Sequence, residues 1–258
     1  MRRCLTASEL ERCERIELGY SGALVLALPA DGPGVQRSFI KIDRIDSADS
    51  LFVEQAVLRQ LAELLPVPRV LAFDQVGEHW VLRMSAVSGI DASDIRLHTQ
   101  PEQLVAALAR ALRRIHALPA QAHSRFDRRL DVTLAEAERR LRAGQVDFDD
   151  LDEERQGLSS EALGMLLRKS RPASEDLVPT HGDYCLPNVL FDPESLALTG
   201  FVDLGRFGLA DRHQDLALAI RSLRHNLDLD YSGMFFEAYG VTPDRDKLAF
   251  YQLLDEFF

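Results

Sequence analysis

Three polar residues in the second half of the sequence have the types and the spacing that transfer of a phosphoryl group requires. Asp183 and Asn188 stand five residues apart in one short loop, and Asp203 follows the apolar segment 198–202. An aspartate can orient an attacking hydroxyl and accept its proton, whereas an asparagine and a second aspartate supply oxygen ligands for Mg²⁺. Each feature alone also fits an ordinary turn, but together they predict a catalytic carboxylate at 183 and metal ligands at 188 and 203.

A lysine and a glutamate in the first third of the sequence complete this set. Lys41 lies in the short apolar segment 39–42, and Glu54 lies on the helix that we expect to follow it. A strand lysine paired with a helix glutamate can hold the α- and β-phosphates of a nucleotide. Ser21, in a glycine-containing turn before the first clear strand, is a weaker candidate for phosphate binding. No Walker A motif is present, so the sequence does not support a P-loop fold.

The order of these residues along the chain is the order in which protein kinases carry the equivalent parts. A strand lysine comes first and a helix glutamate second. An aspartate and an asparagine of a catalytic loop follow, and a metal-binding aspartate comes last. This order predicts a kinase that uses Mg²⁺ and a nucleoside triphosphate, ATP or GTP, as phosphate donor.

The elements that must position these residues change in type near residue 86. Before this point the hydrophobic pattern predicts a helix at 49–64 and strands at 22–28, 39–42, 69–73 and 80–84. After it, two short strands are expected at 189–191 and 198–202, and helical periodicity indicates helices at 101–118, 134–141, 214–226, 231–239 and 245–258. We therefore predict an α+β protein with a β-rich N-terminal nucleotide-binding lobe, 1–86, that contains one helix, and a larger, mainly helical C-terminal lobe, 87–258.

The charge of the protein is the feature of composition that says most about its partners. Lys and Arg number 30 against 41 Asp and Glu, and the formal net charge is −11. This balance argues against nucleic acid, whose phosphates need a basic surface, and favours a cationic partner. No apolar run approaches the roughly 20 residues of a membrane span, and no signal-peptide core is visible. We therefore expect a soluble cytoplasmic protein without a membrane or nucleic-acid partner.

The second half of the sequence resembles the aminoglycoside phosphotransferases, in particular the aminoglycoside 3′-phosphotransferases. The stretch at 181–188 reads His-Gly-Asp-Tyr-Cys-Leu-Pro-Asn, and further similarity lies at 200–217 and 250–258. The resemblance implies a protein-kinase-like bilobal fold that binds ATP or GTP. It also implies that Asp183 is the catalytic carboxylate and that Asn188 and Asp203 are the ligands of Mg²⁺.

The resemblance implies roles for several residues that spacing alone does not identify. Arg206 and Arg221 match arginines in the active sites of relatives, Arg206 among the catalytic residues and Arg221 towards the acceptor. Met84 and Ala86 fall at the lobe hinge, where family members bind the purine through backbone atoms. Asp215 matches a buried aspartate that steadies the catalytic loop.

The acceptor side of the site should be acidic, because an aminoglycoside carries several ammonium groups. The resemblance implies that four side chains and the terminal carboxylate of Phe258 contact the drug, the side chains being those of Asp152, Glu153, Asp255 and Glu256. Phe257 and Phe258 would each forgo about 1.5–3 kcal/mol of apolar burial if they were exposed. We therefore predict that the end of the chain docks on the protein.

The predicted activity is transfer of the γ-phosphate to the 3′-hydroxyl of an aminoglycoside, which gives antibiotic resistance. A kinase of another small alcohol, of the choline, homoserine or ketosamine type, is an alternative, and so is phosphorylation of streptomycin at its 3″-hydroxyl. The segment 255–258 favours the 3′-position. A pseudokinase that binds nucleotide without transfer is the non-enzyme alternative. We expect a monomer or a weak homodimer.

Overall fold

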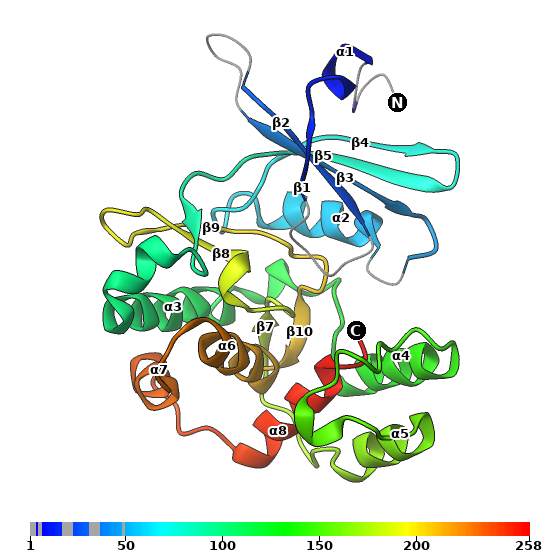
Figure 1. Ribbon diagram of the computed structural model, residues 1–258, viewed down its shortest axis with the longest axis vertical. Helices are drawn as coiled ribbons and strands as arrows, with labels where there is room; N and C mark the ends of the chain where they lie inside the picture. The colour runs from blue at the N-terminus through cyan, green and yellow to red at the C-terminus, as the bar shows by residue number, and fades with distance from the viewer. Residues whose placement is uncertain (1–3, 5–6, 17–22, 31–36, 48–49) are drawn as a thin grey trace. The chain divides into compact units, whose positions relative to one another are not determined.

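The structure, a computed structural model, describes residues 4, 7–16, 23–30, 37–47 and 50–258. Figure 1 shows its helices and strands, coloured from the N-terminus to the C-terminus. Its internal contacts divide the chain into two units. Unit 1 comprises Met1–Asp91 and Asn188–Arg206, and unit 2 comprises Ala92–Pro187 and Phe207–Phe258. The boundary between functional lobes at residues 86 and 87 stays a prediction, because internal contacts do not define which residues bind which substrate.

Unit 1 contains a five-stranded antiparallel sheet in the order β1-β2-β3-β5-β4. A short helix, α1 (Ala7–Leu10), precedes the strands, which are β1 (Glu14–Ile16), β2 (Leu24–Leu28), β3 (Ser38–Arg44), β4 (Val70–Val76) and β5 (His79–Ser85). Ile40 of β3 packs into a buried apolar cluster with Leu26 and Val81. Because side chains alternate along a strand, the neighbouring Lys41 points to the other face of the sheet.

Helix α2 (Leu51–Leu61) follows the third strand of unit 1 and packs against the sheet. Its N-cap is Ser50, whose side chain accepts a hydrogen bond from the backbone N–H of Phe52 at 3.3 Å. The predicted cap, Asp49, lies outside the described residues. Four of the buried positions recur at a spacing of three or four residues, so one face of the helix meets the sheet; they are Leu51, Glu54, Leu58 and Leu61.

A second, smaller sheet in unit 1 has the order β6-β8-β9. It joins Asn188–Arg206 to the first part of the chain through β6 (Ile90–Asp91), β8 (Val189–Phe191) and β9 (Leu198–Phe201). Gly200 lies so close to neighbouring backbone that an added Cβ would stand 2.7 Å from the carbonyl oxygen of Pro66. The next residue, Phe201, donates its N–H to the same oxygen at 2.9 Å. Glycine therefore allows β9 to approach the segment that follows α2.

Unit 2 is mainly helical, and its pairs α3·α7 and α6·α8 are in extensive contact. Its longer helices are α3 (Pro101–His116), α4 (Leu130–Arg142), α5 (Ser160–Lys169), α6 (His213–Asn226), α7 (Ser232–Tyr239) and α8 (Arg245–Asp255). Shorter 3₁₀ turns are η1 (Ile95–Thr99), η2 (Ala120–Ala122), η3 (Glu153–Arg155) and, at the border with unit 1, η4 (Leu186–Asn188). β7 (Leu177–Thr180) and β10 (Gly208–Asp211) form an antiparallel pair.

The α+β fold class predicted from the hydrophobic pattern is confirmed, with differences at some elements. Helix α5, which the sequence analysis did not predict, is capped by Ser159, whose side chain accepts from the N–H of Ala162 at 3.2 Å. The last helix ends at Asp255 rather than running to residue 258. Over the described part of the chain, none of the helices has the length and apolarity to cross a membrane.

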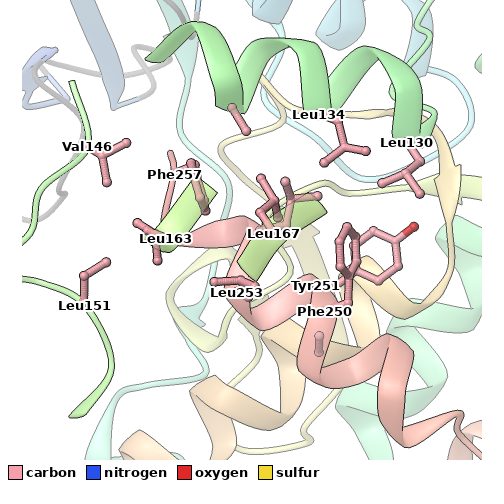
Figure 2. Packing of buried hydrophobic residues seen from close by; sticks show 13 residues of the cluster. Leu130, Leu134, Val146, Leu151, Leu163, Leu167, Phe250, Tyr251, Leu253 and Phe257 are labelled. Carbon is pink, nitrogen blue, oxygen red and sulfur yellow. The ribbon is translucent and has the colours of Figure 1, made fainter. Parts of the chain in front are cut away.

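The apolar core of unit 2 includes the end of the chain (Figure 2). Phe257 has no exposed surface, and it shares one cluster with Leu163 and Leu167 of α5 and with Phe250 of α8. Phe258 is partly buried and packs against the same cluster. The predicted docking of the two terminal phenylalanines is therefore confirmed. The burial of Phe257 also fixes the backbone next to Asp255 and Glu256.

Candidate active site

Lys41 brings together the charged side chains that the sequence analysis assigned to nucleotide binding in unit 1. Its Nζ lies 2.9 and 3.1 Å from the two carboxylate oxygens of Glu54. The same nitrogen lies 2.9 Å from Oδ1 of Asp203, a residue 162 positions further along the chain. The Lys41 and Glu54 side chains are largely buried, whereas the Asp203 side chain is 45% exposed. The predicted Lys41–Glu54 ion pair is therefore present, and it extends to Asp203.

The environment of Lys41 keeps its ammonium group charged. Burial alone would lower the pKa of this group, because a charge is poorly solvated inside a protein. The charges of Glu54 and Asp203, and their hydrogen bonds to Nζ, outweigh burial and raise the pKa above its ordinary value. The side chain is thus a permanent cation next to a partly exposed carboxylate, which suits it to binding phosphate oxygens.

The two proposed metal ligands of unit 1 lie at the same end of one pair of strands. Asn188 directly precedes β8, and Asp203 follows β9, which runs antiparallel to β8. The N–H of Val202 donates to the carbonyl oxygen of Asn188 at 3.0 Å, so the two segments are adjacent. Asp203 has a positive φ of 58°, an uncommon conformation for a residue other than glycine. Such strained backbone is often kept where a side chain must be aimed for function.

The donor set of Asn188 and Asp203 fits Mg²⁺ rather than a softer metal. Mg²⁺ prefers oxygen ligands and is usually held by one or two protein side chains together with phosphates and water. Within the described ranges, no group of three or more His, Cys, Asp or Glu side chains forms a self-sufficient metal site. The residues present therefore fit a magnesium ion that arrives with a nucleotide.

The other residues assigned to nucleotide binding or catalysis in unit 1 are placed as follows. Met84 is buried in β5, and the N–H of Ala86, just after this strand, donates to the carbonyl oxygen of Arg37 at 3.0 Å. That amide would have to leave Arg37 before it could bind a purine. Arg206 is the last residue of unit 1 and is partly buried. Ser21 lies outside the described residues.

The catalytic loop proposed from the sequence belongs to unit 2, where a buried aspartate holds it. Asp215 of α6 has no exposed surface. One of its carboxylate oxygens accepts the backbone N–H of His181 at 2.7 Å, and the other accepts that of Gly182 at 2.9 Å. Gly182 has a φ of 88°, which a residue with a side chain adopts at a cost. These contacts fix the backbone that immediately precedes Asp183.

A histidine that the sequence analysis did not select supports the same aspartate. His116 Nε2 lies 3.0 Å from Oδ2 of Asp215. Because a carboxylate only accepts hydrogen bonds, Nε2 carries the proton in this contact. His116 Nδ1 lies 2.7 Å from the hydroxyl of Tyr239, whose oxygen accepts from Arg212 at 3.0 Å. The chain of contacts from Arg212 to the catalytic loop thus crosses α7, α3 and α6.

The residues assigned to the acceptor form a second charged cluster in unit 2. Arg155 of η3 binds Glu256 with its Nε, at 2.8 and 2.7 Å from the two carboxylate oxygens, and also contacts Asp152. Arg221 of α6 lies 3.1 Å from Oδ1 of Asp152 and 3.0 Å from Oδ2 of Asp255. Two arginines, one of them the predicted Arg221, thus bring together three of the predicted carboxylates, those of Asp152, Asp255 and Glu256.

The remaining acceptor residues lie at the edge of this cluster or beside it. Glu153 is exposed at the start of η3. The guanidinium of Arg140, on α4, donates to the backbone oxygens of Phe257 and Phe258 at 2.6 and 2.8 Å and lies over the Phe258 ring. Arg140 therefore fixes the end of the chain after α8.

Sequence reasoning missed three supporting residues, His116, Arg140 and Arg155. Arg155 lies inside the acidic segment that carried part of the resemblance, yet only its acidic neighbours were selected. The two others occupy helix positions that a periodic pattern assigns to an ordinary surface or core face. Each of the three binds a side chain or backbone oxygen that is at least 99 residues away: His116 binds Asp215, Arg155 binds Glu256, and Arg140 binds Phe258. No local signal in the sequence marks these distant contacts.

Comparison with known proteins agrees with the fold and the charged clusters. Residues 12–251 match the Phosphotransferase enzyme family, and the chain belongs to this family. The protein is therefore a phosphate-transferring enzyme, and the resemblance stated from its motifs is confirmed.

Individual relatives are similar over nearly the whole chain. An aminoglycoside 3′-phosphotransferase of Streptomyces fradiae is 45% identical over 251 residues, which cover 93% of this chain and 92% of the relative. The crystal structure of an aminoglycoside-3′-phosphotransferase of type VIII has a TM-score of 0.86 and 41% identity, covering 96% of this chain and 94% of that one. An aminoglycoside phosphotransferase APH(3″)-Id from Streptomyces rimosus, in complex with ADP and streptomycin, has a TM-score of 0.78 and 30% identity, covering 95% and 92%.

Proposed function

We propose that this protein transfers the γ-phosphate of ATP or GTP to the 3′-hydroxyl of an aminoglycoside antibiotic and thereby gives resistance to the drug. The observation that carries this proposal is the 45% identity to an aminoglycoside 3′-phosphotransferase over almost the full length of both chains. The Lys41 cluster supports the phosphate-binding part, and the acidic residues of unit 2 support a cationic acceptor.

On the donor side, Lys41 binds the nucleotide phosphates while Glu54 holds the lysine in place. The ADP complex of the Streptomyces rimosus relative supports a nucleotide as donor. Asn188 and Asp203 are the residues that would hold Mg²⁺, which when bound neutralises phosphate charge and orients the transferred group. Met84 and Ala86 offer backbone atoms to the purine, Ala86 once its N–H has left the carbonyl oxygen of Arg37. Arg206 offers a positive charge for the transferred phosphoryl group.

On the acceptor side, Asp183 orients the 3′-hydroxyl and takes its proton late in the reaction. Little earlier deprotonation is needed, because phosphoryl transfer passes through a loose transition state in most analyses. Asp152 and Asp255 provide negative charge for the ammonium groups of the drug, with Glu153, Glu256 and Phe258 next to them, and Arg221 provides donors for its hydroxyl oxygens. We also propose that the enzyme acts in the cytoplasm, as a monomer or a weak homodimer.

Release of ADP or GDP in the presence of different acceptors tests the function directly. Kanamycin and neomycin carry a 3′-hydroxyl, tobramycin lacks it, and streptomycin offers a 3″-hydroxyl instead. We expect turnover with the first two drugs and none with tobramycin. Turnover of tobramycin at the rate found with kanamycin would exclude the 3′-position.

A second candidate is phosphorylation of streptomycin at its 3″-hydroxyl, which the similarity to the APH(3″)-Id structure supports. The 3′ assignment is favoured because a 3′-phosphotransferase is 45% identical over 93% of this chain, whereas a streptomycin 3″-kinase of Streptomyces griseus is 35% identical over 74%. Turnover of streptomycin without turnover of kanamycin would establish this second candidate. Choline, homoserine and a ketosamine in the same assay test the remaining alcohols.

A further inference from the structure

Two segments of unit 2 that are about a hundred residues apart in sequence meet at Arg155. One is the acidic segment that leads into η3, and the other follows α8. Arg155 Nε lies 2.8 and 2.7 Å from the two oxygens of Glu256, and its Nη2 contacts the carboxylate of Asp152. The backbone N–H of Asp152 also donates to Oε1 of Glu256 at 3.0 Å. These hydrogen bonds fix both carboxylates at once.

The two arginines of this cluster differ in exposure and therefore in the part they can play. The side chain of Glu256 is 1% exposed and that of Arg155 is 13% exposed, so their ion pair is shielded from solvent. The side chain of Arg221 is 33% exposed, and its partners Asp152 and Asp255 are 35% and 23% exposed. A cationic ligand can thus reach Asp152 and Asp255, where it would compete with Arg221, whereas Glu256 is enclosed by Arg155.

The hydrogen bond between Arg155 and Glu256 also keeps the arginine positively charged. That bond, with the nearby charges of Glu256 and Asp152, raises the pKa of the Arg155 guanidinium against the opposing effect of burial. A guanidinium can bind two carboxylates at once with a planar set of donors, whereas a lysine ammonium offers a compact charge on a flexible stem. The geometry at Arg155 therefore requires an arginine and not only a positive charge.

We propose that Arg155 is a positioning residue for the cationic acceptor, which holds Asp152 in the orientation that receives an ammonium group. The inference rests on the proposed function, in which Asp152 and Asp255 contact the drug. Arg155 touches neither the acceptor nor the nucleotide, and it acts through Asp152 and Glu256. Replacement of Arg155 by Lys removes the planar donor set of the guanidinium, so the Asp152 side chain can turn away. The net charge of the cluster stays the same, because lysine is also a cation.

The test compares Arg155→Lys with the wild-type protein in steady-state turnover of kanamycin. We expect the KM for kanamycin to rise at least tenfold, while the KM for the nucleotide stays within twofold. The KM for kanamycin should also become less sensitive to salt between 50 and 300 mM, because fewer fixed charges then meet the ligand. Arg168→Lys is the matched control, since the Arg168 side chain is 55% exposed and pairs with Glu138 at 3.4 Å on the surface of the same unit.

Several results would overturn this inference. A kanamycin KM within twofold of the wild-type value would show that Arg155 does not position the acceptor site. Equal increases in the KM for both substrates, or an equal effect of Arg168→Lys, would show a general loss of structure. If Arg155→Lys does not fold, Arg155→Gln replaces it in the test, because glutamine keeps side-chain N–H donors. The same changes in the KM for kanamycin and for the nucleotide then decide the outcome. A wild-type protein without turnover of any aminoglycoside would refute the proposed function, and this inference with it.

Discussion

Lys41 Nζ and Asp203 Oδ1 lie 2.9 Å apart although the two residues are 162 positions apart in the sequence. The contact joins the central strand β3 to the segment that follows β9. It places a cation that is always charged beside a carboxylate that is 45% exposed. Lys41 thus links Glu54, its predicted partner in phosphate binding, to Asp203, a predicted metal ligand.

Replacement of Lys41 by Met should weaken nucleotide binding strongly. The phosphates would lose a charge-assisted contact, and the carboxylate of Glu54 would lose its partner in a largely buried position. We expect kcat/KM for the nucleotide to fall at least tenfold, which corresponds to about 1.4 kcal/mol. Lys169→Met, at an exposed position on α5, is the control and should leave this value unchanged. A Lys41→Met protein with the wild-type KM and kcat would refute the assignment of Lys41 to the phosphates.

Replacement of Asp183 by Ala should remove chemistry while leaving nucleotide affinity largely intact. A positioned general base contributes about 10²- to 10⁴-fold to a rate, and we expect a loss in kcat of that order. Nucleotide affinity, measured by calorimetry, should stay within threefold of the wild-type value. If Asp183→Ala keeps the wild-type kcat, Asp183 is not the catalytic carboxylate.

His116 should affect the rate through the catalytic loop rather than through substrate binding. Replacement by Phe removes the donor to Asp215 and leaves a fully buried carboxylate with one hydrogen bond fewer, at a cost of about 1–3 kcal/mol. We expect kcat to fall about tenfold with little change in the nucleotide KM. The variant His116→Gln, which retains an N–H donor, should recover part of this loss. Equal rates for the Phe and Gln variants would show that the hydrogen bond does not matter.

Asp211 should make the stability of the protein depend on pH in the acid range. Burial alone would raise the pKa of this carboxyl, but hydrogen bonds from His213, Lys247 and backbone N–H groups lower it from 3.8 to about 2. A carboxyl with a lowered folded-state pKa contributes stability that is complete above pH about 4 and is lost as the pH falls through about 2. The contribution is about 2 kcal/mol.

The variant Asp211→Asn tests this dependence by urea unfolding at pH 7, 4 and 3. The free energy of unfolding of the wild-type protein should fall more steeply between pH 4 and 3 than that of the variant. Lys247→Met, which removes a donor 2.7 Å from Oδ2 of Asp211, should destabilise the protein at pH 7. Asp228→Asn, at an exposed position, should follow the wild-type profile. Parallel profiles for Asp211→Asn and the wild-type protein would contradict the prediction.

The elements of the fold were largely predictable because apolar side chains repeat with the period of the element that buries them. The pattern around Ile40 predicted a strand, and that of α3 predicted a helix that begins at Pro101. Helix α5 was missed, since it follows an acidic segment and only its buried Leu163 and Leu167 mark a core face. The helix cap at Ser50 was also missed because Asp49 next to it is an equally good cap by residue type.

The sequence by itself determined the class of reaction, phosphate transfer, and it predicted Asp183, Asn188 and Asp203 as the residues that carry it, because their spacing follows from the loops on which they stand. Only the tertiary structure decided which distant side chains hold the site in place. His116 meets Asp215 and Arg155 meets Glu256 across about a hundred residues each. Such pairs depend on how the helices pack in the folded chain. The hydrophobic pattern of the sequence near either partner does not show which distant residue it will meet.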